Sequence, residues 1–184
     1  MDAARSMEQS DAVRLIGAAV PAGAATWADL GAGSGTFTLA LASLLGPGGM
    51  VYAVDRDTDA LRKLVGPGIE RSDRAQIQPV VADFREPLQL PTLDGVLIAN
   101  ALHYVPYADQ ACVLRQIAAL VTPAGLLVVV EYERRNANPW VPYPIPIATL
   151  AELARDAGLG APTPLASRPS RYSGAIYSAV VRCD

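Results

Sequence analysis

The segment Asp29-Leu30-Gly31-Ala32-Gly33-Ser34-Gly35-Thr36 decides the fold of this 184-residue chain. The apolar run before it, residues 25–30, has the length of a buried strand, and residues 36–45 after it are typical of a helix. Glycines at 31, 33 and 35 allow positive φ angles and a close approach of the backbone to a ligand. The following helix would point its free N–H groups into the same place. The segment therefore predicts a strand, a tight turn open to a ligand, and a helix.

Outward from this segment, strands and helices alternate along the chain. Further strands are expected at 50–54, 76–82, 93–99 and 126–131, and further helices at 10–20, 57–65, 108–120 and 147–157. A turn over 122–125 would connect the helix at 108–120 to the strand at 126–131. The pattern predicts a single α/β domain over residues 1–184, with a mostly parallel sheet that carries helices on both faces.

The end of the chain departs from this alternation. Residues 134–146 contain four prolines, which exclude a regular helix or a central strand there. Two closing strands, near 165–168 and at 175–181, have no helix between them. We therefore expect an antiparallel hairpin at one edge of the sheet.

Composition excludes several classes of protein. The chain has 15 Lys and Arg against 18 Asp and Glu, a formal net charge of −3, which argues against nucleic acid as a partner. Cys112 and Cys183 cannot form a disulfide framework or a four-ligand zinc site by themselves. His103 is the one histidine, so a multi-histidine metal centre is excluded within one chain, and no metal is expected.

The sequence also bears on location. No apolar stretch is long enough to cross a bilayer, and Met1–Ser10 has no apolar signal region, so we expect a cytoplasmic protein without a membrane partner. The single lysine, Lys63, and the abundant alanine indicate a GC-rich bacterial gene. Either a monomer or a homodimer is compatible with the sequence.

Polar groups follow every expected strand. In sheets of this type, ligands bind outside the carboxyl ends of the strands. Asp55 is placed to accept hydrogen bonds from the vicinal hydroxyls of a ribose, or else to cap a helix. Asp83 is placed to accept one from an exocyclic amine, with a helix cap as the alternative, and Phe84 offers a flat apolar wall or an ordinary core ring.

These strand ends together carry a family resemblance. The residues 29–35, followed by Val54-Asp55, Ala82-Asp83-Phe84, Asp94-Gly95-Val96 and the run 120–126, resemble class I S-adenosylmethionine-dependent methyltransferases over about residues 10–131. The resemblance implies a Rossmann-like methyltransferase fold with a seven-stranded sheet. It also implies S-adenosylmethionine as cofactor and S-adenosylhomocysteine as product. It does not identify a substrate.

The resemblance also implies roles for individual residues. The glycine turn would hold the methionine part and the ribose, with Asp29 near the amino group. Asp55 would bind the ribose hydroxyls, and Asp83 the adenine amine. Asn100 would lie close to the sulfonium. The full set implied for the cofactor is Asp29, Gly31, Ala32, Gly33, Gly35, Asp55, Arg56, Asp83, Phe84 and Asn100.

Candidates for the acceptor side come from their positions alone. His103 is a candidate general base for a hydroxyl acceptor, or else a packing or capping residue. Glu131 is a candidate base or amine ligand, or else a partner in a salt bridge. Residues 134–146 are predicted to form a substrate-facing lid, with a surface or dimer contact as the alternative. The aromatic candidates for substrate binding are Tyr104, Tyr132, Trp140 and Tyr143.

We therefore expect methyl transfer to an oxygen or nitrogen of a small-molecule acceptor, by in-line displacement. An NAD(P)-type nucleotide-binding oxidoreductase is an alternative, although Thr36 stands where the dinucleotide pattern has its third glycine. A non-catalytic module that binds S-adenosylmethionine or S-adenosylhomocysteine is a second alternative. The Asn-Pro-Pro-aromatic signature of some amine methyltransferases is absent from 100–103.

Overall fold

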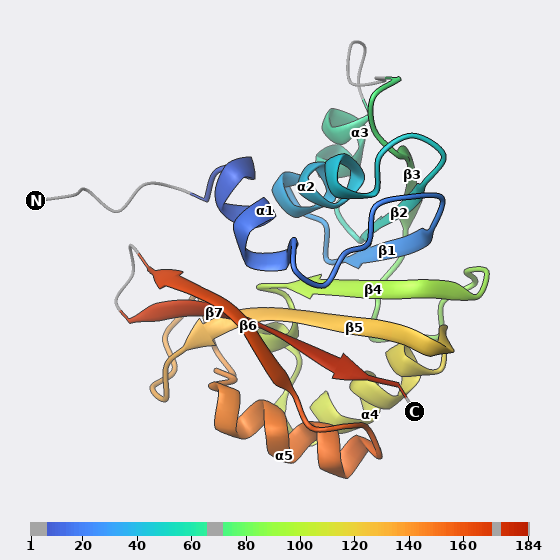
Figure 1. The fold of residues 1–184 in the computed structure, drawn as a ribbon. Helices are drawn as coiled ribbons and strands as arrows, with labels where there is room; N and C mark the ends of the chain where they lie inside the picture. Colours follow the sequence, from blue (N-terminus) through green and yellow to red (C-terminus); the bar gives the residue numbers. More distant parts are fainter. Residues whose placement is uncertain (1–6, 66–71, 171–173, 184) are drawn as a thin grey trace, which may run out of the picture.

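A single seven-stranded sheet forms the centre of the molecule (Figure 1). The computed structural model describes residues 7–65, 72–170 and 174–183. The strands lie in the order β3-β2-β1-β4-β5-β7-β6. Their bounds are β1 Thr26–Leu30, β2 Met50–Asp55, β3 Gln76–Val81, β4 Leu93–Ala99, β5 Val121–Glu133, β6 Thr163–Pro169 and β7 Ala175–Arg182.

Strand directions match the sequence prediction. The first five strands pair in parallel, whereas β7 runs antiparallel to both β5 and β6. Side chains such as Val96 and Ile98 on one face of β4, and Leu97 on the other, are fully buried. The predicted mostly parallel sheet with an antiparallel hairpin at its edge is therefore confirmed.

Helices cover both faces of the sheet (Figure 1). The helices α1 (Gln9–Ile16) and α2 (Thr36–Leu45) share a core with Leu97. The helices α4 (Tyr107–Ala118) and α5 (Ile147–Ala157) pack against the opposite face, in the core that contains Val96 and Ile98. The short helix α3 (Thr58–Leu64) follows β2, and Asp57 caps it by accepting N–H groups from Asp59 and Ala60.

Two helix boundaries differ from the prediction. The first helix ends at Ile16 and not at residue 20, because Gly17 is a poor helix former and Pro21 disfavours helical geometry at the residue before it. Val20 is nevertheless buried in the same core as the helix. The helix expected at 108–120 ends at Ala118, where the chain tightens and the Leu120 N–H donates to Ile117 O.

The predicted turn over 122–125 lies inside a strand. The strand β5 already begins at Val121, which pairs with Leu93, but the next pair joins Gly95 to Leu126. The intervening residues therefore form a bulge. Pro123 has no N–H group for a sheet ladder, so a bulge accommodates it where regular pairing does not.

The topology sets the place of the site. Strand β1 pairs with β2 on one side and with β4 on the other, so the chain changes direction of progress across the sheet at β1. A crevice opens at such a point, outside the carboxyl ends of the strands.

Among the described residues, no helix is both long and apolar enough to span a membrane. Most of the N-terminal segment Met1–Ser10, in which no signal region is expected, lies outside the described residues.

Candidate functional site

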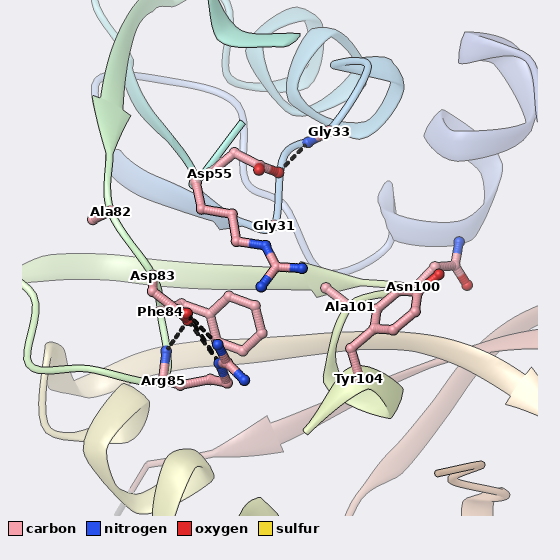
Figure 2. A pocket seen from close by; sticks show the side chains of 11 residues that line it. Gly31, Gly33, Asp55, Ala82, Asp83, Phe84, Arg85, Asn100, Ala101 and Tyr104 are labelled. Atoms are coloured by element: carbon pink, nitrogen blue, oxygen red, sulfur yellow. Dashed lines mark hydrogen bonds and ion pairs between the residues drawn. The ribbon is translucent and has the colours of Figure 1, made fainter. Parts of the chain in front are cut away.

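A cavity of about 400 Å³ lies at the carboxyl ends of β1, β2 and β4 and just beyond β3 (Figure 2). We refer to it as the first cavity. Most of its lining was expected from the sequence. The lining residues are Gly31, Gly33, Asp55, Arg56, Ala82, Asp83, Phe84, Arg85, Asn100, Ala101 and Tyr104.

The first cavity requires glycine at position 31. Gly31 has φ +78°, and a Cβ atom there would lie 2.5 Å from the Cβ atom of Ala101 and 3.6 Å from Phe84 Cε1. Gly33 also has a positive φ, +50°. Because these residues carry no side chains, the backbone of the turn borders the cavity directly.

Asp55 connects the end of β2 to the glycine turn (Figure 2). Its Oδ2 accepts the Gly33 N–H at 2.8 Å, and its Oδ1 accepts the Asp57 N–H at 2.8 Å. Each carboxylate oxygen keeps a further acceptor site after these bonds. The side chain is thus held in one orientation and can still bind hydroxyl groups.

Asp83 is held by a neighbour that was not singled out from the sequence. The Arg85 guanidinium donates to both Asp83 oxygens, with Nε at 2.9 and 3.0 Å (Figure 2). These bonds lower the pKa of the Asp83 carboxyl below its ordinary value. The carboxylate is therefore ionised at neutral pH and fixed at the wall of the first cavity.

Asn100 is strained and incompletely satisfied. It has φ +51°, and it is the one non-glycine with positive φ in the described part of the chain. Its buried Oδ1 has no hydrogen-bond partner among the described residues. Buried acceptors are normally paired, and backbone strain is concentrated at functional sites. Asn100 therefore offers an acceptor for a donor group of a ligand.

A second cavity of about 180 Å³ shares Asn100 and Tyr104 with the first. We call it the acceptor cavity. The segment predicted to be a lid contributes a large part of its wall. The lining residues are Asn100, His103, Tyr104, Tyr132, Arg134, Asn138, Trp140 and Val141.

His103 and Glu131 form a buried pair at the acceptor cavity. His103 Nδ1 lies 2.7 Å from Glu131 Oε2, and the His103 backbone N–H donates to Glu131 Oε1 at 3.1 Å. The two residues are 1% and 0% exposed. In the arrangement where Glu131 is a carboxylate, which only accepts hydrogen bonds, and the imidazole is neutral, Nδ1 donates to Glu131 and Nε2 keeps its lone pair. This is the tautomer that a general base requires.

Three of the four aromatic candidates meet at the acceptor cavity. The ring of His103 contacts those of Tyr104 and Tyr132, with centroids 4.4 and 5.8 Å apart. Trp140 is 72% exposed. Its backbone N–H donates to the Oδ1 atom of Asn138, two positions earlier, at 2.9 Å.

The structure places Tyr143 elsewhere. Its ring packs edge-on against Tyr107, with centroids 5.2 Å apart, and neither tyrosine lines the first cavity or the acceptor cavity. Its contribution comes from the backbone, because the Tyr143 N–H donates to His103 O at 3.1 Å. The prolines that flank Tyr143 fix its backbone, and the ring turns toward α4 and away from the acceptor cavity.

Three described residues implied for the cofactor do not line the first cavity. They are Asp29, Ala32 and Gly35. A Cβ atom on Gly35 would lie 2.3 Å from Leu64 Cδ1, so this glycine lets α3 pack against the turn. Ala32 belongs to the same small core as Leu64.

Asp29 predicts a pH dependence of stability. It is 1% exposed and accepts the Thr38 hydroxyl at 2.6 Å. Burial raises its pKa from 3.8 to about 7, although the Thr38 bond opposes the shift, and the charge of Asp55 adds to it. A raised carboxyl pKa means that the folded state holds a proton that the unfolded state has lost. Stability is therefore expected to fall as the pH rises from about 4 to above 7.

The variant Asp29→Asn checks this expectation. It removes the ionisable group and keeps an acceptor for Thr38, so its stability should lose this pH dependence. Thermal unfolding at pH 5 and pH 8 measures the effect. We expect the stability of the variant relative to the wild type to rise by about 3 kcal/mol from pH 5 to pH 8, because pH 5 lies about two units below the raised pKa of about 7 and each unit counts about 1.4 kcal/mol. An unchanged difference between the two proteins would show that Asp29 does not carry the raised pKa.

Six lining residues were not named individually from the sequence, and three of them, Arg134, Asn138 and Val141, lie in the segment predicted to be a lid. Arg85 and Arg134 are charged residues near expected strand ends, and an acid two or three positions earlier was the available signal. Ala82 and Ala101 are too small to be recognised by their chemistry. Asn138 and Val141 belong to the irregular segment, in which no periodicity shows which side chains face inward.

Within the described ranges, no cluster of three or more His, Cys, Asp or Glu could hold a metal ion.

Comparison with known proteins gives a family match. The family described as "Methyltransferase domain" matches residues 28–125, which is more than half of the chain. No curated protein matches the chain.

Solved structures give a second comparison. The mitomycin 7-O-methyltransferase MmcR has a TM-score of 0.68 and 26% identity, and the match covers 95% of this chain and 53% of that protein. A second match is a 1,6-didemethyltoxoflavin-N1-methyltransferase of Burkholderia thailandensis, solved with 1,6-didemethyltoxoflavin and S-adenosylhomocysteine. It has a TM-score of 0.64 and 25% identity, and the match covers 94% of this chain and 79% of that protein. A SAM-dependent methyltransferase from Aquifex aeolicus shares the fold, with a TM-score of 0.67 and 14% identity. This match covers 97% of this chain and 100% of that protein. The chain thus spans about half the length of MmcR.

Proposed function

Because the chain belongs to the methyltransferase-domain family, we propose that it transfers the methyl group of S-adenosylmethionine to a hydroxyl oxygen of a small aromatic acceptor. The family membership disfavours the oxidoreductase alternative. One observation carries the choice of a hydroxyl acceptor. His103, which is buried and paired with Glu131, lines a cavity that adjoins the larger one at Asn100 and Tyr104.

The residues of the first cavity fit the proposed cofactor. S-adenosylmethionine, when bound, supplies an electrophilic methyl group on a sulfonium. Gly31 and Gly33 leave their backbone open, and Asn100 presents an unpaired buried acceptor that suits the amino group of the methionine part. Two fixed carboxylates suit the other donors, with Asp55 for the ribose hydroxyls and Asp83 for the adenine amine.

The remaining residues of the cofactor set complete this assignment. Arg56 and Phe84 line the first cavity and would flank the adenine ring. Asp29, Ala32 and Gly35 do not line the first cavity and are packed against other parts of the protein, so we assign them to positioning rather than to direct contact.

The acceptor cavity supplies a base. A hydroxyl oxygen must lose its proton when it gains a methyl group, whereas a neutral amine can attack first and lose its proton later. Nε2 of His103 would take the hydroxyl proton, and Glu131 would stabilise the resulting imidazolium. Tyr104, Tyr132 and Trp140 would hold the acceptor ring, with Trp140 on the irregular segment 134–146 as part of a lid.

The solved neighbours are compatible with this assignment. The mitomycin enzyme is named for methylation at oxygen and the toxoflavin enzyme for methylation at nitrogen, so they support a small-molecule acceptor without choosing its atom. The choice of oxygen rests on His103 and Glu131.

Binding experiments test the cofactor assignment. We expect calorimetric titration to detect both S-adenosylmethionine and S-adenosylhomocysteine, and Asp55→Ala to weaken both by about tenfold or more, because the two ribose hydroxyls lose a charged acceptor. Asp59→Ala is the matched control. It removes an acid four positions further along the chain, in the first turn of α3, whose side chain is 78% exposed. This change should leave both affinities unchanged.

The outcomes separate the alternatives. Tighter binding of NAD(P)H than of S-adenosylmethionine would contradict the proposed cofactor. A panel of phenols, incubated with S-adenosylmethionine and analysed by mass spectrometry, tests the transfer itself. Tight cofactor binding without methylation of any hydroxyl acceptor would favour the non-catalytic module.

A further inference from the structure

Arg134 is the one arginine or lysine that lines the acceptor cavity within the described chain. It follows β5 directly, three positions after Glu131. The side chain is half-buried, and its Nε donates to Asn136 O at 2.7 Å. This bond anchors the base of the guanidinium, and its two terminal nitrogens have no hydrogen-bond acceptor among the described residues.

No acid among the described residues pairs with this guanidinium. The carboxylates nearest to it along the chain have other partners. Glu131 accepts from His103, and Glu133 Oε2 accepts the Ile147 N–H at 3.0 Å. A half-buried arginine with free terminal donors, at the wall of a cavity, is suited to bind an anionic group of a ligand.

The rest of the cavity constrains what carries that anion. Its walls include the rings of Tyr104, Tyr132 and Trp140. Its volume is about 180 Å³, and a cavity of about 150 Å³ is known to hold a benzene ring. The part of the acceptor that enters the cavity is therefore about the size of one substituted ring.

We propose that the acceptor is a hydroxylated aromatic carboxylic acid, whose carboxylate pairs with the Arg134 guanidinium while its hydroxyl faces His103. The hydroxyl end of this assignment rests on the proposed function, and the carboxylate end rests on Arg134. A guanidinium binds a carboxylate through two parallel hydrogen bonds, which fixes the ring in its plane as well as in its position. Arg134 would thus select acidic phenols over neutral ones.

Titration without a methyl donor tests the anchor alone. The protein is saturated with S-adenosylhomocysteine and titrated by calorimetry with the hydroxybenzoate isomers and with their carboxamides, which have the same shape but no charge. We expect at least one acid to bind about tenfold or more tightly than its amide. Arg134→Gln should remove this preference, and Arg135→Gln, an exposed neighbour that lines neither cavity, should retain it.

Three results would overturn the anchor: equal binding of acids and amides, no binding of any isomer, or a preference that survives Arg134→Gln. The affinity for S-adenosylhomocysteine checks that the variant is folded, since Arg134 does not line the first cavity. Failure of the anchor is distinguishable from failure of the proposed function. Methylation of neutral phenols as readily as acids would refute only the anchor, whereas Arg134-dependent acid binding without methyl transfer would refute only the reaction.

Discussion

Replacement of His103 by glutamine is expected to lower the rate of methyl transfer by about 100-fold to 10,000-fold, the range that a positioned general base contributes. The affinity for S-adenosylhomocysteine should stay within about twofold of the wild type. His103 lines the acceptor cavity and not the first one, so its loss affects proton transfer and not cofactor binding. Turnover with a phenolic acceptor and calorimetric titration measure the two effects separately.

Glutamine is the informative replacement because of the buried partner. Glu131 is 0% exposed and accepts both the ring and the backbone N–H of residue 103. Alanine would leave its carboxylate without the ring partner, at a cost of about 3–5 kcal/mol for an uncompensated buried charge. A glutamine amide can still donate to Glu131 but cannot accept a proton from the substrate.

The variant Glu131→Gln provides a second, independent test of His103 as the general base. A glutamine at 131 can donate to Nδ1, which places the ring proton on Nε2 and removes the lone pair that acts as base. An Asp→Asn change of this kind in a serine protease lowers kcat by about 10,000-fold. Tyr107→Phe, outside both cavities, is the control and should retain full activity. Near wild-type turnover of a phenol by His103→Gln would show that His103 is not the base.

The fold could be predicted because its local signals agree. In β4, residues 95–99 carry no polar side chain and are buried on both faces, which is the pattern of a central parallel strand. Asp57 caps α3, and Gly158, with φ +78°, ends α5, as their residue types predict. The start of β5 was not predictable in this way, because Pro123 and Gly125 are turn residues by type. They lie in a bulge between Val121 and Leu126, and only the pairing of these two residues with β4 places the segment within a strand.

The acceptor side shows where sequence reasoning ends. His103 and Glu131 were each identifiable as polar residues after a buried strand, but their contact joins positions 28 apart and depends on β4 and β5 being neighbours. Arg134 and Arg135 are adjacent basic residues that the sequence alone does not distinguish. Only the folded chain shows that one of the two lines a cavity and the other does not. The direction of a side chain in an irregular segment is set by packing, which leaves no periodic signal.

Gly31→Ala is expected to produce the largest loss of cofactor binding from the addition of a single carbon. Its Cβ atom would lie 2.5 Å from the Cβ atom of Ala101, and both residues line the first cavity. The backbone must move to relieve this contact, at a cost of about 1–3 kcal/mol for overpacking, and the left-handed φ of +78° adds about 1–2 kcal/mol. The shift should lower the affinity for S-adenosylhomocysteine by about tenfold or more, because the cavity wall itself is displaced.

Two further variants separate steric collision from backbone strain. Gly158 has the same φ of +78°, but a Cβ atom there would meet nothing within 4 Å, so Gly158→Ala should lower the melting temperature without changing cofactor affinity. Ala101→Gly removes the atom with which the new Cβ collides. Combined with Gly31→Ala, it should restore most of the affinity while the strain remains, because Phe84 Cε1, at 3.6 Å, is at ordinary contact distance. If the double variant binds no better than Gly31→Ala, the collision with Ala101 is not the cause, and glycine is needed at position 31 for its φ angle alone.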